Sequence, residues 1–219
     1  MVVSFSSNLS TLNLNSSSEN VGTRTGVPPT NLTHAGYART VGLHDYGGLD
    51  HSDFFATVGM NIYDLWKDAF CNVNGQKATL EEALKAKQYK KVYFQIGINE
   101  MGRGTLDGFM NEYQNAVEKF KTLQPDAIIY VEANLHVTAQ RSDSDKTFNN
   151  ANINAFNQKI STLADQRTIY YLDINELFDD ANGNLGTQYS NDNAHPLGKY
   201  YAVWCDWLME HAVVRDGKS

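Results

Sequence analysis

Three short, almost continuous apolar segments constrain the fold of this chain more than any other feature. They are residues 91–96 (KVYFQI), 127–132 (AIIYVE) and 168–172 (TIYYL). Short apolar runs rich in β-branched and aromatic side chains are typical of strands that are buried on both faces. A long amphipathic stretch at residues 105–123 predicts a helix between the first two. Buried strands that alternate with helices predict an α/β fold, in which helices cover both faces of a parallel sheet.

Weaker signals extend this alternation in both directions. Residues 54–56 predict another strand, and a capping box formed by Thr79 and Glu82 predicts the start of a short helix. Further helices are predicted over residues 61–69, 152–163 and 197–211. The chain therefore reads as a three-layer sandwich of helices, sheet and helices.

The N-terminal part has a different composition. Residues 1–33 are rich in Ser, Thr and Asn, and Glu19 and Arg24 are their only charged side chains. Sparse apolar residues leave little surface to bury, so we expect a flexible or irregular arm, with a strand at residues 2–5. Residues 34–219 are predicted to form the folded domain.

Composition excludes several classes of function. The 219 residues carry 18 Lys and Arg against 25 Asp and Glu, a formal charge of −7, and no long basic run. A nucleic-acid partner is therefore not expected, because phosphate binding needs clustered positive charge. No apolar stretch approaches the roughly 20 residues that span a bilayer. The start lacks a basic region typical of a signal peptide, so we expect a cytoplasmic protein or the mature form of a secreted one. The oligomeric state is left open.

Neither a disulfide framework nor a metal site is predicted. Cys71 and Cys205 are the only cysteines, and two buried free thiols are the favoured interpretation, with one bridge between them as the alternative. Four histidines show no ligand spacing, namely His34, His44, His51 and His211. We therefore expect neither a metal nor another cofactor.

Polar residues gather just after the predicted strands. The residues concerned are Gly59, Gly97, Asn99, Glu100, Asn134, His136 and Asp173. Parallel sheets bind ligands beyond the carboxyl ends of their strands. The sequence therefore predicts a ligand site at this edge of the sheet.

A general-base unit precedes the last predicted helix. Asp192 lies three residues before His195 in the segment Asn191–Pro196. A carboxylate at this spacing can hold one imidazole nitrogen while the other accepts a proton from a nucleophile. The pair therefore predicts two members of a hydrolase triad.

These blocks resemble the SGNH, or GDSL, hydrolase family, most closely a bacterial branch. Gly97-Ile98-Asn99 is similar to its Gly-x-Asn block, Asp192 and His195 to its Asp-x-x-His block, and Gly59 to its single-glycine block. The resemblance implies a parallel, flavodoxin-like sheet of five strands in the order 2-1-3-4-5. It also implies an oxyanion hole made by the Asn99 amide and the backbone N–H groups of Gly59 and of the nucleophile.

The family's Gly-Asp-Ser block is altered. Here the corresponding residues are Gly36, Tyr37 and Ala38, followed by the Arg39-Thr40-Val41-Gly42 flank that the bacterial branch shows. Alanine keeps the backbone N–H but has no oxygen with which to attack a carbonyl. The resemblance therefore implies an ester hydrolase that is inactive or very weak as written.

The resemblance also implies a substrate class and leaves two alternatives open. A small acyl or acetyl ester is expected, with an acylated carbohydrate as one candidate, contacted by Gly97, Glu100, Arg39, Asn134 and His136. One alternative is a non-catalytic protein that binds such a ligand. The other is an active hydrolase that uses Ser6 or Ser7 as its nucleophile.

Overall fold

A mixed α/β fold is observed in the computed structural model, which describes residues 2–5, 42, 45 and 52–213. One sheet contains the strands β1 (Val2–Phe5), β2 (Ser52–Phe55), β5 (Lys91–Phe94), β6 (Ile128–Glu132) and β7 (Ile169–Leu172). The helices are α2 (Leu80–Ala86), α3 (Leu106–Leu123), α4 (Ala139–Ser144), α5 (Asn150–Ser161), α6 (Asn175–Phe178) and α7 (Tyr201–Glu210). Short 3₁₀ turns span Ile98–Glu100, Thr187–Tyr189 and Gly198–Tyr200.

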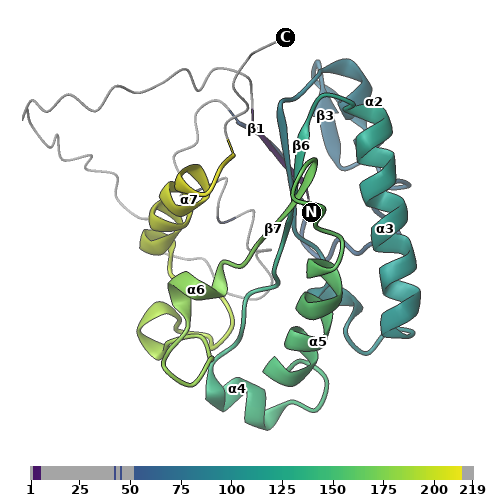
Figure 1. Cartoon of the computed structure of the whole chain (residues 1–219). Helices are drawn as coiled ribbons and strands as arrows, with labels where there is room; N and C mark the ends of the chain where they lie inside the picture. The colour runs from purple at the N-terminus through teal and green to yellow at the C-terminus, as the bar shows by residue number, and fades with distance from the viewer. Residues whose placement is uncertain (1, 6–41, 43–44, 46–51, 214–219) are drawn as a thin grey trace, which may run out of the picture.

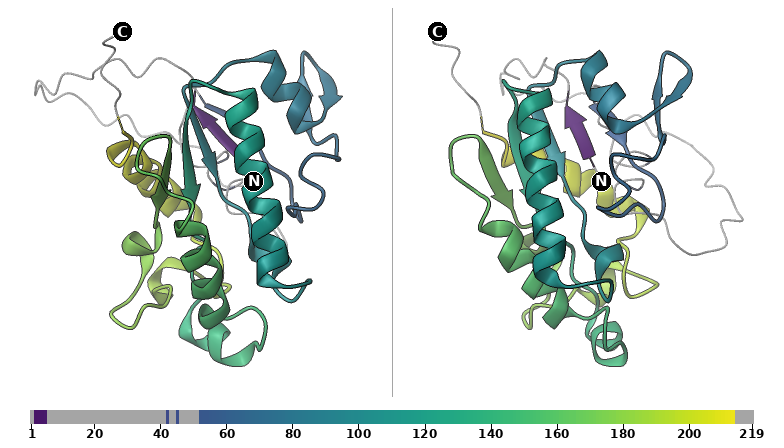
Figure 2. Two further views of the ribbon diagram at one scale, coloured as in Figure 1. Left: turned by 45° about the vertical axis from the view of Figure 1, so that its right-hand side comes forward. Right: turned by 90° about the vertical axis from the view of Figure 1, so that its right-hand side faces the viewer.

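Helices lie on both sides of this sheet. Figures 1 and 2 show α2, α3 and α5 on one side and α6 and α7 on the other. Alternate side chains of the buried strands divide between these two layers. Val92 and Phe94 join the core under α3, whereas Tyr93 and Tyr130 stack in the core under α7, with ring centroids 4.5 Å apart. The predicted sandwich of helices, sheet and helices is therefore observed.

The sheet differs from the expected arrangement in the direction of one strand. Its order is β2-β1-β5-β6-β7, and β5, β6 and β7 are parallel, but β1 pairs antiparallel with both of its neighbours. An antiparallel ladder satisfies backbone groups as fully as a parallel one, so an apolar segment can enter a sheet in either direction. The five-stranded parallel, flavodoxin-like sheet is therefore not what the structure has. The strand predicted at residues 2–5 is present, and the rest of the predicted arm lies outside the described residues.

Two local predictions differ from the structure. The predicted helix over residues 61–69 is absent, and residues 62–67 form consecutive turns instead. Two backbone bonds in this segment span three residues rather than four: Asn61 O accepts the N–H of Asp64 at 3.3 Å, and Asp64 O accepts that of Lys67 at 3.0 Å. An unpredicted hairpin joins β3 (Cys71–Val73) to β4 (Gln76–Ala78). Its Asn74-Gly75 turn has positive φ at both residues, as two-residue hairpin turns require.

Other expectations are met. Thr79 and Glu82 form the predicted reciprocal capping box at the start of α2. Cys71 and Cys205 are buried free thiols, and burial raises the pKa of each to about 12. Among the helices that the structure describes, none is long and apolar enough to cross a membrane.

One core residue is an acid. Glu132, at the end of β6, is 2% exposed, and neither of its carboxyl oxygens has a hydrogen-bond partner among the described residues. Burial raises its pKa to about 8, because an ionised carboxylate cannot be solvated there. The side chain is therefore a neutral acid at neutral pH.

This acid should make stability depend on pH. The pKa of Glu132 is higher in the folded than in the unfolded chain, so its contribution is full below about pH 4.5 and is lost as pH rises to about 8, at roughly 1.4 kcal/mol per unit. Glu132→Gln, which cannot ionise, should raise the free energy of unfolding at pH 9 relative to the unaltered chain and flatten the curve. Denaturant unfolding from pH 5 to 9 measures this, with exposed Glu112→Gln as control. Parallel curves for Glu132→Gln and the unaltered chain would contradict the assignment.

Candidate active site

The predicted base and its orienting carboxylate are in direct contact. Asp192 Oδ2 lies 2.7 Å from His195 Nδ1, and Asp192 Oδ1 accepts the backbone N–H groups of Ala194 and His195 at 3.0 and 2.8 Å. Burial alone would raise the pKa of Asp192, but these hydrogen bonds outweigh it and lower the pKa to about 2. An ionised Asp192 favours a proton on Nδ1, which leaves Nε2 free to accept one.

The loop that carries this pair is attached to the segment after β6. The Thr138 backbone N–H donates to Asn193 O at 3.0 Å, and the Thr138 hydroxyl donates to Asn193 Oδ1 at 2.9 Å. Asn193 has a φ of 69°, a conformation that asparagine adopts more readily than most residues. These bonds turn the chain between Asp192 and His195 and fix both to the carboxyl edge of the sheet.

The two predicted oxyanion donors come from adjoining loops. Asn99 Nδ2 donates to Met60 O at 2.7 Å, which joins the turn after β5 to the residue next to Gly59. Gly59 has a φ of 77°, and a Cβ built on it would meet no atom within 4 Å. Gly59 and Asn99 are both exposed, whereas Met60 is buried. One proton of the Asn99 amide is engaged by Met60, so the other remains for a ligand.

A small apolar cluster unites this turn with the His195 loop. Ala194 packs with Val137 and Ile153, and Ile98 packs against the same cluster. Ala194 and Ile98 directly precede His195 and Asn99 respectively, so two blocks that are about 96 positions apart in the sequence meet at one edge of the sheet. This is the edge that the sequence predicted.

Position 97 requires glycine because the Asn134 side chain lies close to its backbone. Its φ is 144°, and a Cβ at this position would lie 2.7 Å from Asn134 Nδ2. Only glycine combines that backbone with that contact. Gly97 therefore has a steric role beside Asn99.

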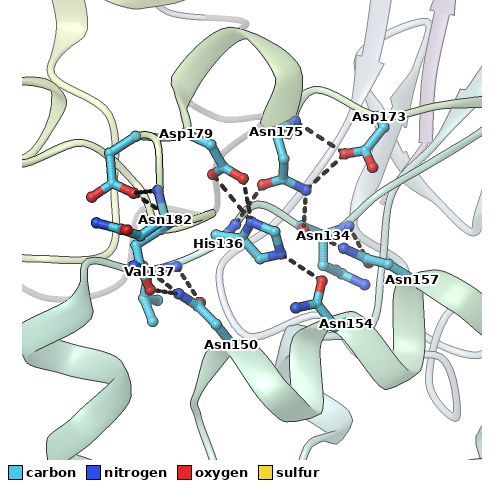
Figure 3. A network of polar contacts seen from close by, with 12 residues as sticks. Asn134, His136, Val137, Asn150, Asn154, Asn157, Asp173, Asn175, Asp179 and Asn182 are labelled. Atoms are coloured by element: carbon cyan, nitrogen blue, oxygen red, sulfur yellow. Dashed lines mark hydrogen bonds and ion pairs between the residues drawn. The ribbon is translucent and has the colours of Figure 1, made fainter.

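Asn134 and His136 lie inside a polar network rather than on an open rim. Figure 3 shows how side chains from α5 and α6 converge on the segment after β6. The Asn134 backbone N–H donates to Asn157 Oδ1 at 2.7 Å, and its carbonyl accepts from Asn157 and Asn175. Asn150 pairs in the same way with both backbone groups of Val137. These amides replace the sheet partners that the chain loses beyond β6.

His136 is held between two acceptors. Its Nδ1 lies 2.8 Å from Asp179 Oδ2, and its Nε2 lies 2.8 Å from Asn154 Oδ1 (Figure 3). Burial lowers the pKa of His136, but the hydrogen bonds to Asp179 and Asn154 outweigh it and raise the pKa above the ordinary value. With an acceptor at each nitrogen, the ring favours its doubly protonated form and ties α5 to the loop after α6.

Asn150, Asn157 and Asn175 were not predicted from the sequence as residues of the site. Asparagine is disfavoured in helix interiors, yet Asn154 and Asn157 lie within α5. Together with Asn150 at the start of the helix, they follow the spacing of one helix face. That pattern was the available signal. It could not reveal the partners, which come from a distant part of the chain.

Part of the predicted site lies outside the described residues, namely Ala38 with its neighbours Tyr37 and Arg39, and the alternative nucleophiles Ser6 and Ser7. Gly42, which ends the same block, is described. A Cβ at Gly42 would collide with the ring of Tyr201, so this end of the block lies against the start of α7. Within the described part of the chain, no three His, Cys, Asp or Glu side chains form a group that could hold a metal ion.

Comparison with known proteins identifies the family. The profile of the GDSL-like lipase/acylhydrolase family matches residues 18–203. This chain belongs to that family. The match covers most of the chain, starts before the predicted boundary at residue 34, and includes the altered block around Ala38. No curated protein sequence matches the chain.

Several solved structures share the fold. A putative platelet activating factor from Streptococcus pneumonia is 18% identical with a TM-score of 0.55, and the match covers 70% of this chain and 68% of that one. A putative lipolytic protein of the G-D-S-L family from Desulfitobacterium hafniense is 16% identical, with a TM-score of 0.52 and 69% and 75% coverage. The acetyl xylan esterase AlAXEase is 17% identical, with a TM-score of 0.51 and 71% and 77% coverage.

The effect of the hydrogen bond between Asp179 and His136 can be tested by titration. Asp179→Asn removes the charge that faces Nδ1, so the pKa of His136 should fall towards or below its ordinary value. Imidazole chemical shifts followed by NMR from pH 4 to 9 measure this pKa, with exposed Asp143→Asn as control. An unchanged His136 pKa in Asp179→Asn would show that the carboxylate does not stabilise the imidazolium.

Proposed function

We propose that this GDSL-like domain binds small acyl esters in a site built for serine hydrolysis, and that Ala38 at the nucleophile position leaves it inactive or very weak. The contact between His195 and Asp192 is the observation that carries the proposal. An imidazole that is oriented by an ionised carboxylate and has one free nitrogen can act as a general base. Membership in the lipase/acylhydrolase family supports ester chemistry in general.

Each remaining residue has a role in this scheme. With a serine at position 38, its hydroxyl oxygen would attack the ester carbonyl while His195 Nε2 takes the proton. The oxyanion would accept hydrogen bonds from the Asn99 amide and from the backbone N–H groups of Gly59 and residue 38. His195 then returns the proton to the departing alcohol, and water releases the acyl group by the same steps. No cofactor or metal enters this scheme.

The proposed substrate is a chemical class rather than one molecule. A short acyl or acetyl ester fits this site, because the proposed donors would bind the carbonyl oxygen of such an ester. An acylated carbohydrate is one candidate. Likeness to an acetyl xylan esterase is consistent with this candidate but rests on the fold. We assign Arg39 to the substrate rim, and Gly97, Asn134 and His136 to shaping the edge on which the site stands.

Restoring the nucleophile tests the proposal. The unaltered chain should hydrolyse p-nitrophenyl acetate barely above background, because removing the serine of a triad lowers kcat by roughly 10⁶. Ala38→Ser, with Tyr37→Asp if the ring blocks access, should raise turnover by several orders of magnitude. Steady-state kinetics measure the gain. His195→Ala should abolish it, and Asn99→Ala should reduce kcat by about 10²–10³.

Two results would favour the alternatives. A fast esterase in the unaltered chain would move the nucleophile elsewhere, and Ser6→Ala and Ser7→Ala would then identify it. A folded Ala38→Ser, Tyr37→Asp variant that stays inert would favour a protein that only binds its ligand.

A further inference from the structure

Two neighbouring side chains join the turn after β5 to the loop that follows Gly59. Asn99 Nδ2 donates to Met60 O at 2.7 Å, and Glu100 Oε1 accepts the backbone N–H of Ile62. The partners are 39 and 38 positions apart in the sequence. Contacts of this range fix one loop relative to the other, which local turns cannot do.

Glu100 is placed to act through the backbone and not on a ligand. Its side chain is 1% exposed, although Asn99 beside it is exposed. Glu100 Oε2 is buried and has no hydrogen-bond partner among the described residues. Burial raises the pKa of this carboxyl group, against the opposing effect of the Ile62 N–H. A neutral acid fits this environment, since an ionised oxygen without a donor is costly.

The two bonded loops carry both proposed donors of the oxyanion hole. Gly59 is next to Met60, and a side chain at its Cα would meet open space. The free proton of the Asn99 amide and the Gly59 N–H can serve one oxygen only if the loops keep a fixed separation. Donors must lie about 2.7–3.1 Å from that oxygen, so small loop shifts matter.

We propose that Glu100 is a positioning residue of the oxyanion hole: by accepting the Ile62 N–H, its carboxyl group holds the Gly59 loop where Gly59 and Asn99 can bind one carbonyl oxygen. This inference rests on the proposed function. It replaces the expectation that Glu100 contacts the substrate, because the carboxyl group is buried under the turn.

The first experiment uses the unaltered chain and needs no activity. In Glu100→Ala, the Ile62 amide should exchange with solvent faster, and the NMR signals of the Gly59 N–H and the Asn99 side-chain amide should shift. Glu100→Gln keeps an acceptor and mimics the neutral acid. The exchange rate of the Ile62 amide and the signals of Gly59 and Asn99 should therefore stay close to those of the unaltered chain. Gln124→Ala is the matched control, because buried Gln124 accepts a distant backbone N–H, that of Tyr89 at 2.8 Å. Gln124→Ala should change neither the exchange rate of the Ile62 amide nor the signals of Gly59 and Asn99.

The second experiment measures kcat and KM in the Ala38→Ser background. Adding Glu100→Ala should lower kcat by about 10²-fold, comparable to the loss of one oxyanion donor, with little change in KM. Glu100→Gln should restore most of kcat. Gln124→Ala should lower the melting temperature but leave kcat unchanged below the transition. This split separates a positioning role from a general loss of stability.

Different failures have different meanings. If Glu100→Gln loses as much kcat as Glu100→Ala, the charge itself acts and the positioning role is wrong. If Glu100→Ala stays folded without moving the Gly59 and Asn99 signals, the role is also wrong. If the variant with both Ala38→Ser and Tyr37→Asp is inert while those signals shift as expected, the proposed hydrolysis fails but the coupling of the loops by Glu100 stands.

Discussion

The parallel pairing of β5, β6 and β7 is the constraint on which the rest of the structure depends. Parallel strands bring their carboxyl ends to one edge, and helices bury both faces of the sheet. The chain that leaves each strand must therefore satisfy its backbone groups without sheet partners and with little water. Asn150, Asn157 and Asn175 supply those bonds, which gives the segment after β6 a fixed course.

The fixed course of the segment after β6 determines where Asp192 and His195 lie. Thr138 lies at its end and holds Asn193, and the turn at Asn193 in turn brings Asp192 to His195. On the other side, Glu100 and Asn99 hold the Gly59 loop against the end of β5. The proposed general base and the two proposed oxyanion donors are thus held by packed and hydrogen-bonded loops. Such preorganisation keeps a site in shape whether or not a nucleophile is present.

Much of this could be predicted from sequence, for physical reasons. The runs at 91–96 and 127–132 are apolar on both faces, so burial was evident, and the capping box at Thr79 has a local signature. The reversed direction of β1 could not be predicted, because side chains alternate identically in both directions. The buried roles of His136 and Glu100 depend on partners some 40 positions away. No local pattern encodes such pairings.

We propose that this chain keeps the general base and the oxyanion donors of an ester-hydrolase site although the nucleophile is missing. Labelling with a fluorophosphonate tests it most directly, because an activated serine oxygen bonds to phosphorus, fluoride leaves, and the general base takes the serine proton. Intact-mass spectrometry with peptide mapping should find no adduct on the unaltered chain and one adduct at position 38 of Ala38→Ser. An adduct on Ser6 or Ser7 of the unaltered chain would contradict the account, as would the absence of an adduct on a folded variant that combines Ala38→Ser with Tyr37→Asp.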